Sequence, residues 1–190
     1  MNQRGHTLIE MLCVIAILLV GGSLAAPWVR AYSVEAHILG AGREFKGEFL
    51  RARSTAVRLG VQTAIRFEHE SDGEYYSTYA DGNFNGVLAQ DIRTGRDRRI
   101  AGPFRLDGRA PGVRVGINPG VPAIPPETGS LNPADPIRFS ADMLSFSPLG
   151  TATPGTFYLA GESAQGAVRV TAGTARVRLL VCRGTRWVER

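Results

Sequence analysis

Apolar and polar positions divide the first sixty residues of the chain into two parts. Residues 11–29 contain no charged side chain, and a run of this length is about what a helix needs to cross a hydrocarbon core. Residues 34–59 instead place apolar side chains at steps of three, four or seven, the pattern of a helix that buries one face. We therefore predict one helix from about Thr7 to Leu59, about 80 Å long at 1.5 Å per residue. Its first half would lie in a membrane or filament and its second half would pack on the C-terminal part of the chain.

Glycine and proline interrupt this helical pattern at several points. Pro27 and the pair Gly21-Gly22 should loosen the helix, and Gly60 is a natural place for it to end. The glycines at 40, 42 and 47 should each weaken it by up to about 1 kcal/mol relative to alanine. Tertiary packing must therefore hold the second half.

After Gly60 the pattern changes to short runs that suit β-strands. Residues 61–67 and 74–80 predict a hairpin around Ser71-Asp72-Gly73. Further strands are predicted at 98–106, 113–117, 137–140, 144–147, 156–160, 167–171 and 176–182. Residues 118–136 hold six of the eleven prolines and favour an irregular loop. The predicted fold class is α+β, one long N-terminal helix packed on antiparallel sheet.

Composition adds little to this prediction. The formal charge is +5 and the basic residues are arginine except Lys46. The planar fork of arginine suits phosphate and carboxylate recognition, but a genome rich in arginine codons explains the bias equally well. Cys13 and Cys182 should lie in different media, so we predict that they form no disulfide.

A short polar segment precedes the apolar run, with the sequence Arg4-Gly5-His6-Thr7-Leu8-Ile9-Glu10. A carboxylate at the bilayer centre costs roughly 2.5–3.5 kcal/mol, so Glu10 needs a partner. Cleavage after Gly5 would supply one, because the new α-amine on His6 would have an ordinary pKa near 8 and be mostly cationic.

This segment resembles the class III leader of type IV pilins and type II secretion pseudopilins. The resemblance implies that a prepilin peptidase cleaves after Gly5 and methylates the new N-terminus. It also implies that Glu10 pairs with the N-terminal amine of a neighbouring subunit during assembly. His6 stands where phenylalanine is common, which leaves methylation less secure than cleavage. The alternatives are a plain membrane anchor, a secretory signal peptide cut after Leu24-Ala25-Ala26, and a buried helix of a soluble protein. Glu10 fits neither of the first two, and the unbroken apolar run disfavours the third.

The C-terminal third resembles the GspH/FimT pattern of minor pseudopilins and minor pilins. The matching stretches are Phe146-Ser-Pro-Leu-Gly150, Gly155-Thr-Phe-Tyr-Leu159, Val168-Arg-Val170 and Gly173-Thr-Ala-Arg-Val-Arg178. One departure is Ala175, where a glycine is usual. The resemblance implies a pilin-like fold.

One loop has the residue spacing of a calcium site. Asp81, Asn83, Asn85 and Asp91 offer oxygen ligands at alternate positions, as in a D-x-N-x-N-G loop. The twelfth position is Ile92 rather than glutamate, however, and no flanking helices are predicted. We favour an Asx-rich turn whose side chains bond to their own backbone. We predict no cofactor, with calcium at this loop as the alternative.

The sequence shows no catalytic pattern. His6, His37 and His69 fall on different predicted elements, and no nucleophile elbow, phosphate loop or metal-ligand spacing is present. We therefore predict that the protein is not an enzyme.

Arginines crowd the last predicted strands, where Arg176, Arg178, Arg183 and Arg186 lie beside Trp187. Arginines with an aromatic ring can hold a nucleic-acid backbone and stack a base. FimT-type minor pilins are associated with DNA uptake through such a segment, and Arg176 and Arg178 are the matching positions. The other interpretation, which we favour, is a solvated strand face.

These observations predict four segments. They are a leader at 1–5, a transmembrane or filament-core helix at 6–30, an amphipathic helix at 31–60 and a periplasmic β domain at 61–190. The leading hypothesis is a minor pseudopilin of type II secretion in the bacterial inner membrane, at or near the tip of a pseudopilus. Its partners would be other pseudopilins, the prepilin peptidase and the inner-membrane assembly platform. The alternative is a FimT-like minor type IV pilin that binds DNA.

Overall fold

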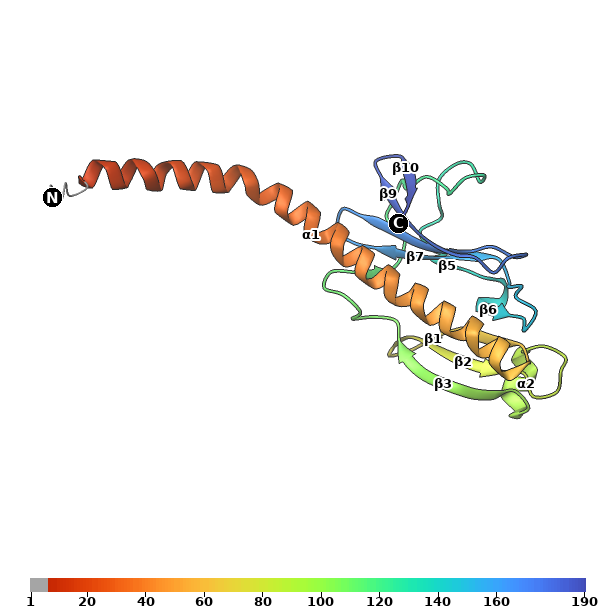
Figure 1. The fold of residues 1–190 in the computed structure, drawn as a ribbon. Coiled ribbons are helices and arrows are strands. Elements are labelled where there is room, and N and C mark those ends of the chain that lie inside the picture. Colours follow the sequence, from red (N-terminus) through yellow and green to blue (C-terminus); the bar gives the residue numbers. More distant parts are fainter. Residues whose placement is uncertain (1–6) are drawn as a thin grey trace.

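One long helix dominates the molecule (Figure 1). The computed structural model describes the backbone from Thr7 to Arg190 and the side chains of these residues except 24–29 and 31. Helix α1 (Leu8–Leu59) is 52 residues long and runs without interruption through the glycine pair and the proline of its first half. It ends at Gly60, whose φ of 70° lies in the left-handed region that glycine adopts without strain. The predicted helix is confirmed.

The remaining chain forms two antiparallel sheets, which we call sheet A and sheet B. Sheet A has the order β3-β2-β1-β6 and consists of β1 (Thr63–Glu70), β2 (Gly73–Ala80), β3 (Arg98–Arg105) and β6 (Met143–Phe146). Sheet B has the order β10-β9-β8-β7-β4, with β5 also paired to β7. Its strands are β4 (Arg114–Val115), β5 (Ile137–Arg138), β7 (Gly155–Ala160), β8 (Gln165–Val170), β9 (Val177–Arg183) and β10 (Arg186–Glu189). Two short helices are α2 (Ala89–Thr94) and η1 (Ser140–Asp142). This is the α+β, pilin-like arrangement that the sequence predicts.

Most predicted strands are present, with shifted ends. The hairpin is confirmed, with β1 continuing to Glu70 before its turn. The strands predicted at 113–117 and 137–140 shrink to two residues each, β4 and β5. Helix α2 and strand β10 were not predicted. Residues 118–136 form the predicted irregular loop, with only an isolated bridge between Pro122 and Ser130.

The second half of α1 packs against both sheets. Phe45 and Phe49 are almost completely buried and meet Phe157 of sheet B, with ring centroids 4.5 Å and 6.2 Å apart. Phe67 of sheet A stacks on Phe157 at 5.5 Å, so aromatic rings close the junction of the two sheets beneath the helix. The periodic apolar pattern of residues 34–59 is therefore explained by one continuous core.

A second, smaller core lies on the face of sheet B that points away from α1. There Ile124 and Leu131, both from the proline-rich loop, pack on Tyr158 and Leu180. Trp187 joins them, and its Nε1 donates a hydrogen bond to the carbonyl oxygen of Pro122 at 2.9 Å. The loop is thus irregular in backbone but anchored to the sheet by apolar contacts.

Among the residues that the structure describes, no helix is both long enough and apolar enough to span a membrane. The membrane-spanning part of the predicted helix stays a prediction.

Candidate assembly site

The first half of α1 projects beyond the two sheets (Figure 1). The large apolar side chains that the structure describes there, from Leu8 to Val20, are exposed, with exposed fractions of 81% at Leu8 and 71% at Ile17. Soluble monomers rarely expose a continuous apolar surface of this size, and such a surface marks contact with other proteins or with lipid. This half of the helix is therefore the candidate assembly surface.

Glu10 lies at the N-terminal end of this surface. Its Oε2 accepts a hydrogen bond from the backbone N–H of Thr7 at 3.1 Å, and its own N–H donates to Thr7 Oγ1 at 3.4 Å. The two residues form a capping box, which satisfies backbone donors that the first turn of a helix leaves open. The helix dipole also favours a negative charge at this end. Gly5 and His6 lie outside the described residues.

Ion pairs link α1 to sheet B near the point where the helix begins to project beyond the sheets. Arg30 contacts Glu162 of the β7–β8 turn at 2.8 Å, and Arg183 at the end of β9 contacts Glu35 at 2.5 Å. Exposed pairs of this kind contribute about 0–1 kcal/mol each. They therefore add little to the stability of the fold. The partners are more than 100 residues apart in sequence, so no local pattern predicts them.

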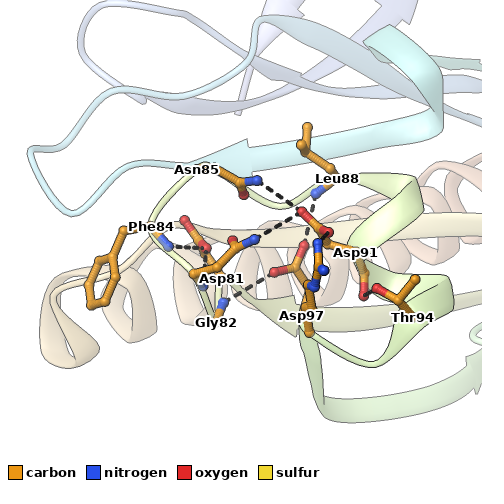
Figure 2. A network of polar contacts seen from close by, with 10 residues as sticks. Asp81, Gly82, Phe84, Asn85, Leu88, Asp91, Thr94 and Asp97 are labelled. Atoms are coloured by element: carbon orange, nitrogen blue, oxygen red, sulfur yellow. Dashed lines mark hydrogen bonds and ion pairs between the residues drawn. The ribbon is translucent and has the colours of Figure 1, made fainter.

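The loop with calcium-like spacing is a hydrogen-bonded network (Figure 2). Asp81 is buried, and its Oδ1 accepts from the backbone N–H groups of Asn83 and Phe84 at 3.0 Å and 2.8 Å. Its Oδ2 accepts from the N–H of Gly86 at 2.7 Å. These are the side-chain-to-backbone bonds that the Asx-turn interpretation predicts.

The other carboxylates of the loop are also engaged. Asp91 Oδ2 accepts from the side-chain amides of Asn85 and Asn83 at 3.0 Å and 3.2 Å, and these bonds hold the pKa of Asp91 below its ordinary value. Asp97 accepts from the N–H groups of Gly82 and Leu88 at 3.1 Å and 2.9 Å (Figure 2). Sequence reasoning missed Asp97 because its partners are set by the return of the chain into β3.

The asparagines of this loop turn their amide nitrogens toward Asp91, whereas a calcium loop would use their oxygens. In the part of the chain that the structure describes, no group of three or more His, Cys, Asp or Glu side chains is placed to hold a metal ion. Calcium at this loop stays an untested alternative.

The histidines do not come together within the described residues. His37 lies on α1, whereas His69 lies on β1, where its Nδ1 is 3.2 Å from Glu74. The two cysteines are free. Burial raises the pKa of the Cys182 thiol, which disfavours its reactive thiolate form.

The structure places the four candidate DNA-binding arginines near the C-terminus but pairs three of them with carboxylates. Arg176 and Arg178 both approach Glu189, at 2.8 Å and 3.8 Å. Arg183 contacts Glu35 on α1, while Arg186 is exposed on β10. The segment therefore offers a partner less free positive charge than its sequence indicates.

Two family models match the chain. Residues 1–26 match the prokaryotic N-terminal methylation motif, and residues 41–175 match the type II transport protein GspH. No curated protein and no solved structure matches the chain significantly. The second model spans well over half of the chain, including most of α1's packed half and much of both sheets. Together with the helix-on-sheet fold and the leader, this match shows that the chain belongs to the GspH family of pilin-like minor pseudopilins.

Proposed function

We propose that the protein is a minor pseudopilin of a type II secretion system. It would assemble through α1 at or near the tip of a periplasmic pseudopilus that drives protein export. The observation that carries this proposal is the division of α1, with an apolar, projecting first half and a second half buried against the sheets. The partners are other pseudopilins, the prepilin peptidase and the inner-membrane assembly platform. The family is structural rather than catalytic, in keeping with a role in assembly.

In this proposal the mature chain begins at His6 and is held in the inner membrane by a single pass of α1, with the β domain in the periplasm. During assembly the carboxylate of Glu10 moves from the edge of the membrane into an apolar helix bundle, where an unpaired charge is costly. The N-terminal amine of a neighbouring subunit would offset that cost. Glu10 would thus serve in turn as a helix cap and as an assembly charge.

Two substitutions at Glu10 separate these roles. Glutamine is the neutral residue that also completes a capping box, so Glu10→Gln keeps the cap and removes the charge, whereas Glu10→Ala removes both. If charge pairing drives assembly, both variants should crosslink to partner pseudopilins far less than the wild type. The β domain should stay folded in each, because Glu10 lies in the first turn of α1, in the half of the helix that projects beyond the sheets (Figure 1). Wild-type crosslinking by Glu10→Gln would show that the charge is dispensable and would overturn the pairing role.

A further inference from the structure

A groove runs between the last turns of α1 and strand β3, which is the edge strand of sheet A. We call it the α1–β3 groove. Its volume of about 320 Å³ lies within the range of clefts that bind other molecules, about 300–1,000 Å³. Residues from one face of α1 form its helical wall. They are Glu48, Arg51, Ala52, Thr55, Arg58 and Leu59.

Large apolar side chains gather at this groove. Ile100 and Phe104 of β3 are 43% and 42% exposed, and Leu59 at the end of α1 is 44% exposed. All three line the groove. Single exposed apolar residues are common on soluble proteins, whereas large ones gathered around one concave surface mark a contact with another molecule. The α1–β3 groove is therefore a candidate docking surface.

The helical wall of the groove is polar and carries free positive charge. Its positions recur along α1 at steps of three and four residues, which places them on one face of the helix. Arg51 lies 3.0 Å from Glu48, which offsets its charge. Arg58 is exposed, and within the described chain it has no ion pair. The groove therefore presents apolar surface along β3 and an unpaired guanidinium group on α1.

We propose that the α1–β3 groove binds an amphipathic helix of a different pseudopilin, with its apolar side against β3 and a carboxylate beside Arg58. The free positive charge selects an acidic partner, because complementary charges orient an association and exclude wrong partners. The wall from residue 48 to residue 59 is about 17 Å long at 1.5 Å per residue, or about three helical turns. A helix that docks in a groove presents apolar anchors every three or four residues over such a length. The inference rests on the proposed function and adds a docking surface to it.

Within the described residues, no other part of this chain offers a matching segment, so the occupant belongs to a different chain. Helix α2 has six residues and buries its Asp91. The projecting half of α1 has Glu10 as its one carboxylate, which the proposed function assigns to the N-terminal amine of a neighbour. Figure 1 shows β3 alongside the second half of α1, so a partner can occupy the groove while the projecting half packs in a filament. A contact with a different chain also suits a subunit present in few copies.

Site-specific photo-crosslinking of the full chain, in cells that carry the rest of its secretion machine, identifies the occupant. A photo-reactive amino acid replaces Thr55, which lines the groove, and the matched control places it at the neighbouring exposed Ser54, outside the groove. We expect position 55, but not position 54, to give an adduct with a different pseudopilin, joined at a segment with apolar and acidic residues. Mass spectrometry of the adduct identifies both the chain and the segment. An adduct with a second copy of this chain or with an exported protein, equal adducts at both positions, or no adduct at all would overturn the proposal.

Two substitutions then test the apolar and the charged part of the contact, with the crosslinking group kept at position 55. Ile100→Asp and Arg58→Glu should each lower the adduct yield by about tenfold or more, the loss typical of an anchor residue in an interface. The matched controls, Leu50→Asp and Arg43→Glu, change exposed positions of α1 outside the groove and should leave the yield unchanged. Circular dichroism checks that each variant is folded.

Wild-type yield from either groove variant, or an equal loss in its control, would show that the groove does not select the partner and would overturn the proposal. Gly5 and Glu10 are unchanged throughout, so this assay can fail while the Glu10 test succeeds.

Discussion

Glu10 connects the local chemistry of a helix end to the assembly of many chains. The same carboxylate that accepts the N–H of Thr7 would stand at the fifth position of the new N-terminus after cleavage at Gly5. We expect mass spectrometry of membrane-extracted protein to show a mature chain that begins at His6. A chain beginning near Pro27 would instead indicate a secretory signal peptide, and an uncut chain in the presence of the peptidase would exclude processing at Gly5.

Asp91 makes the polar loop sensitive to acid. Its folded pKa is held below the unfolded value, near 3.9, chiefly by the amide of Asn85 and then by that of Asn83. Its contribution to stability is therefore present above about pH 4 and is lost as the pH falls through the folded pKa. Asn85→Ala should raise the pKa of Asp91, so that the loss begins at a higher pH.

NMR titration of the Asp91 carboxyl measures this shift. Gln90→Ala is the matched control, because Gln90 is the direct neighbour of Asp91 on α2 and its side chain is not among the groups that shift the pKa of Asp91. The control should titrate like the wild type. An unchanged titration in Asn85→Ala would mean that the amide of Asn85 does not hold the carboxylate.

Ala175 stands where a glycine is expected, and only part of the consequence can be read from the sequence. A glycine is usual at this position of the C-terminal pattern, and the structure gives Ala175 a φ of 46°, which costs an alanine more than a glycine. The side chain is also completely buried in the main core. The sequence shows that alanine replaces the usual glycine. Only the structure shows that the methyl group of Ala175 is buried in the core.

Two glycines of α1 have opposite roles at the scale of the element. A Cβ on Gly42 would overlap with Leu179 Cδ1, whereas a Cβ on Gly40 would meet nothing within 4 Å. Alanine gains up to about 1 kcal/mol of helix propensity at either site. At position 42 overpacking against the buried Leu179 costs typically about 1–3 kcal/mol, so the packing penalty should prevail.

We therefore expect Gly40→Ala to raise the thermal stability of the β domain and the helix half packed on it, and Gly42→Ala to lower it. Near-ultraviolet circular dichroism of the full chain in detergent follows unfolding of the core in both variants. If both variants were stabilised equally, Leu179 would have to move aside at little cost. The packing of α1 on sheet B would then not require a glycine at position 42.

Helices and strands could be predicted where neighbouring residues alone form the pattern that identifies them. The pattern of residues 34–59 and the turn after Glu70 follow from periodicity and turn residues, and both are confirmed. Strand β10 was missed because its four residues are too few to show an alternation of apolar and polar positions. Its Trp187 is held by the distant Pro122. Helix α2 has only six residues and depends on the buried carboxylates around it. Gly5 and Glu10 could be proposed from the sequence because a leader is a contiguous motif, and their roles stay predictions.

At the scale of the whole molecule, function depends on which charges remain free after folding. The sequence predicts a cluster of arginines near the C-terminus, but the fold pairs Arg176 and Arg178 with Glu189. Near α2 the fold buries Asp81, Asp91 and Asp97 and leaves Arg93, Arg98 and Arg99 exposed, a difference that the sequence does not predict. The distribution of free charge is a tertiary property, and it bears directly on the choice between the secretion and DNA-uptake hypotheses.

The DNA hypothesis makes a measurable prediction about these two arginines. Each phosphate contact releases condensed counterion, so affinity for DNA that depends on Arg176 and Arg178 must fall steeply with salt. Because Glu189 already pairs with both guanidinium groups, we expect only the weak, low-salt binding of any basic protein. Replacing both arginines by glutamine should barely change this weak binding.

Fluorescence anisotropy of a labelled DNA duplex measures the affinity of the full chain in detergent across a salt series, for the wild type and the double variant. A large loss of affinity in the variant, with a salt slope flatter by roughly one to two units, would favour a DNA-binding minor pilin over a secretion pseudopilin.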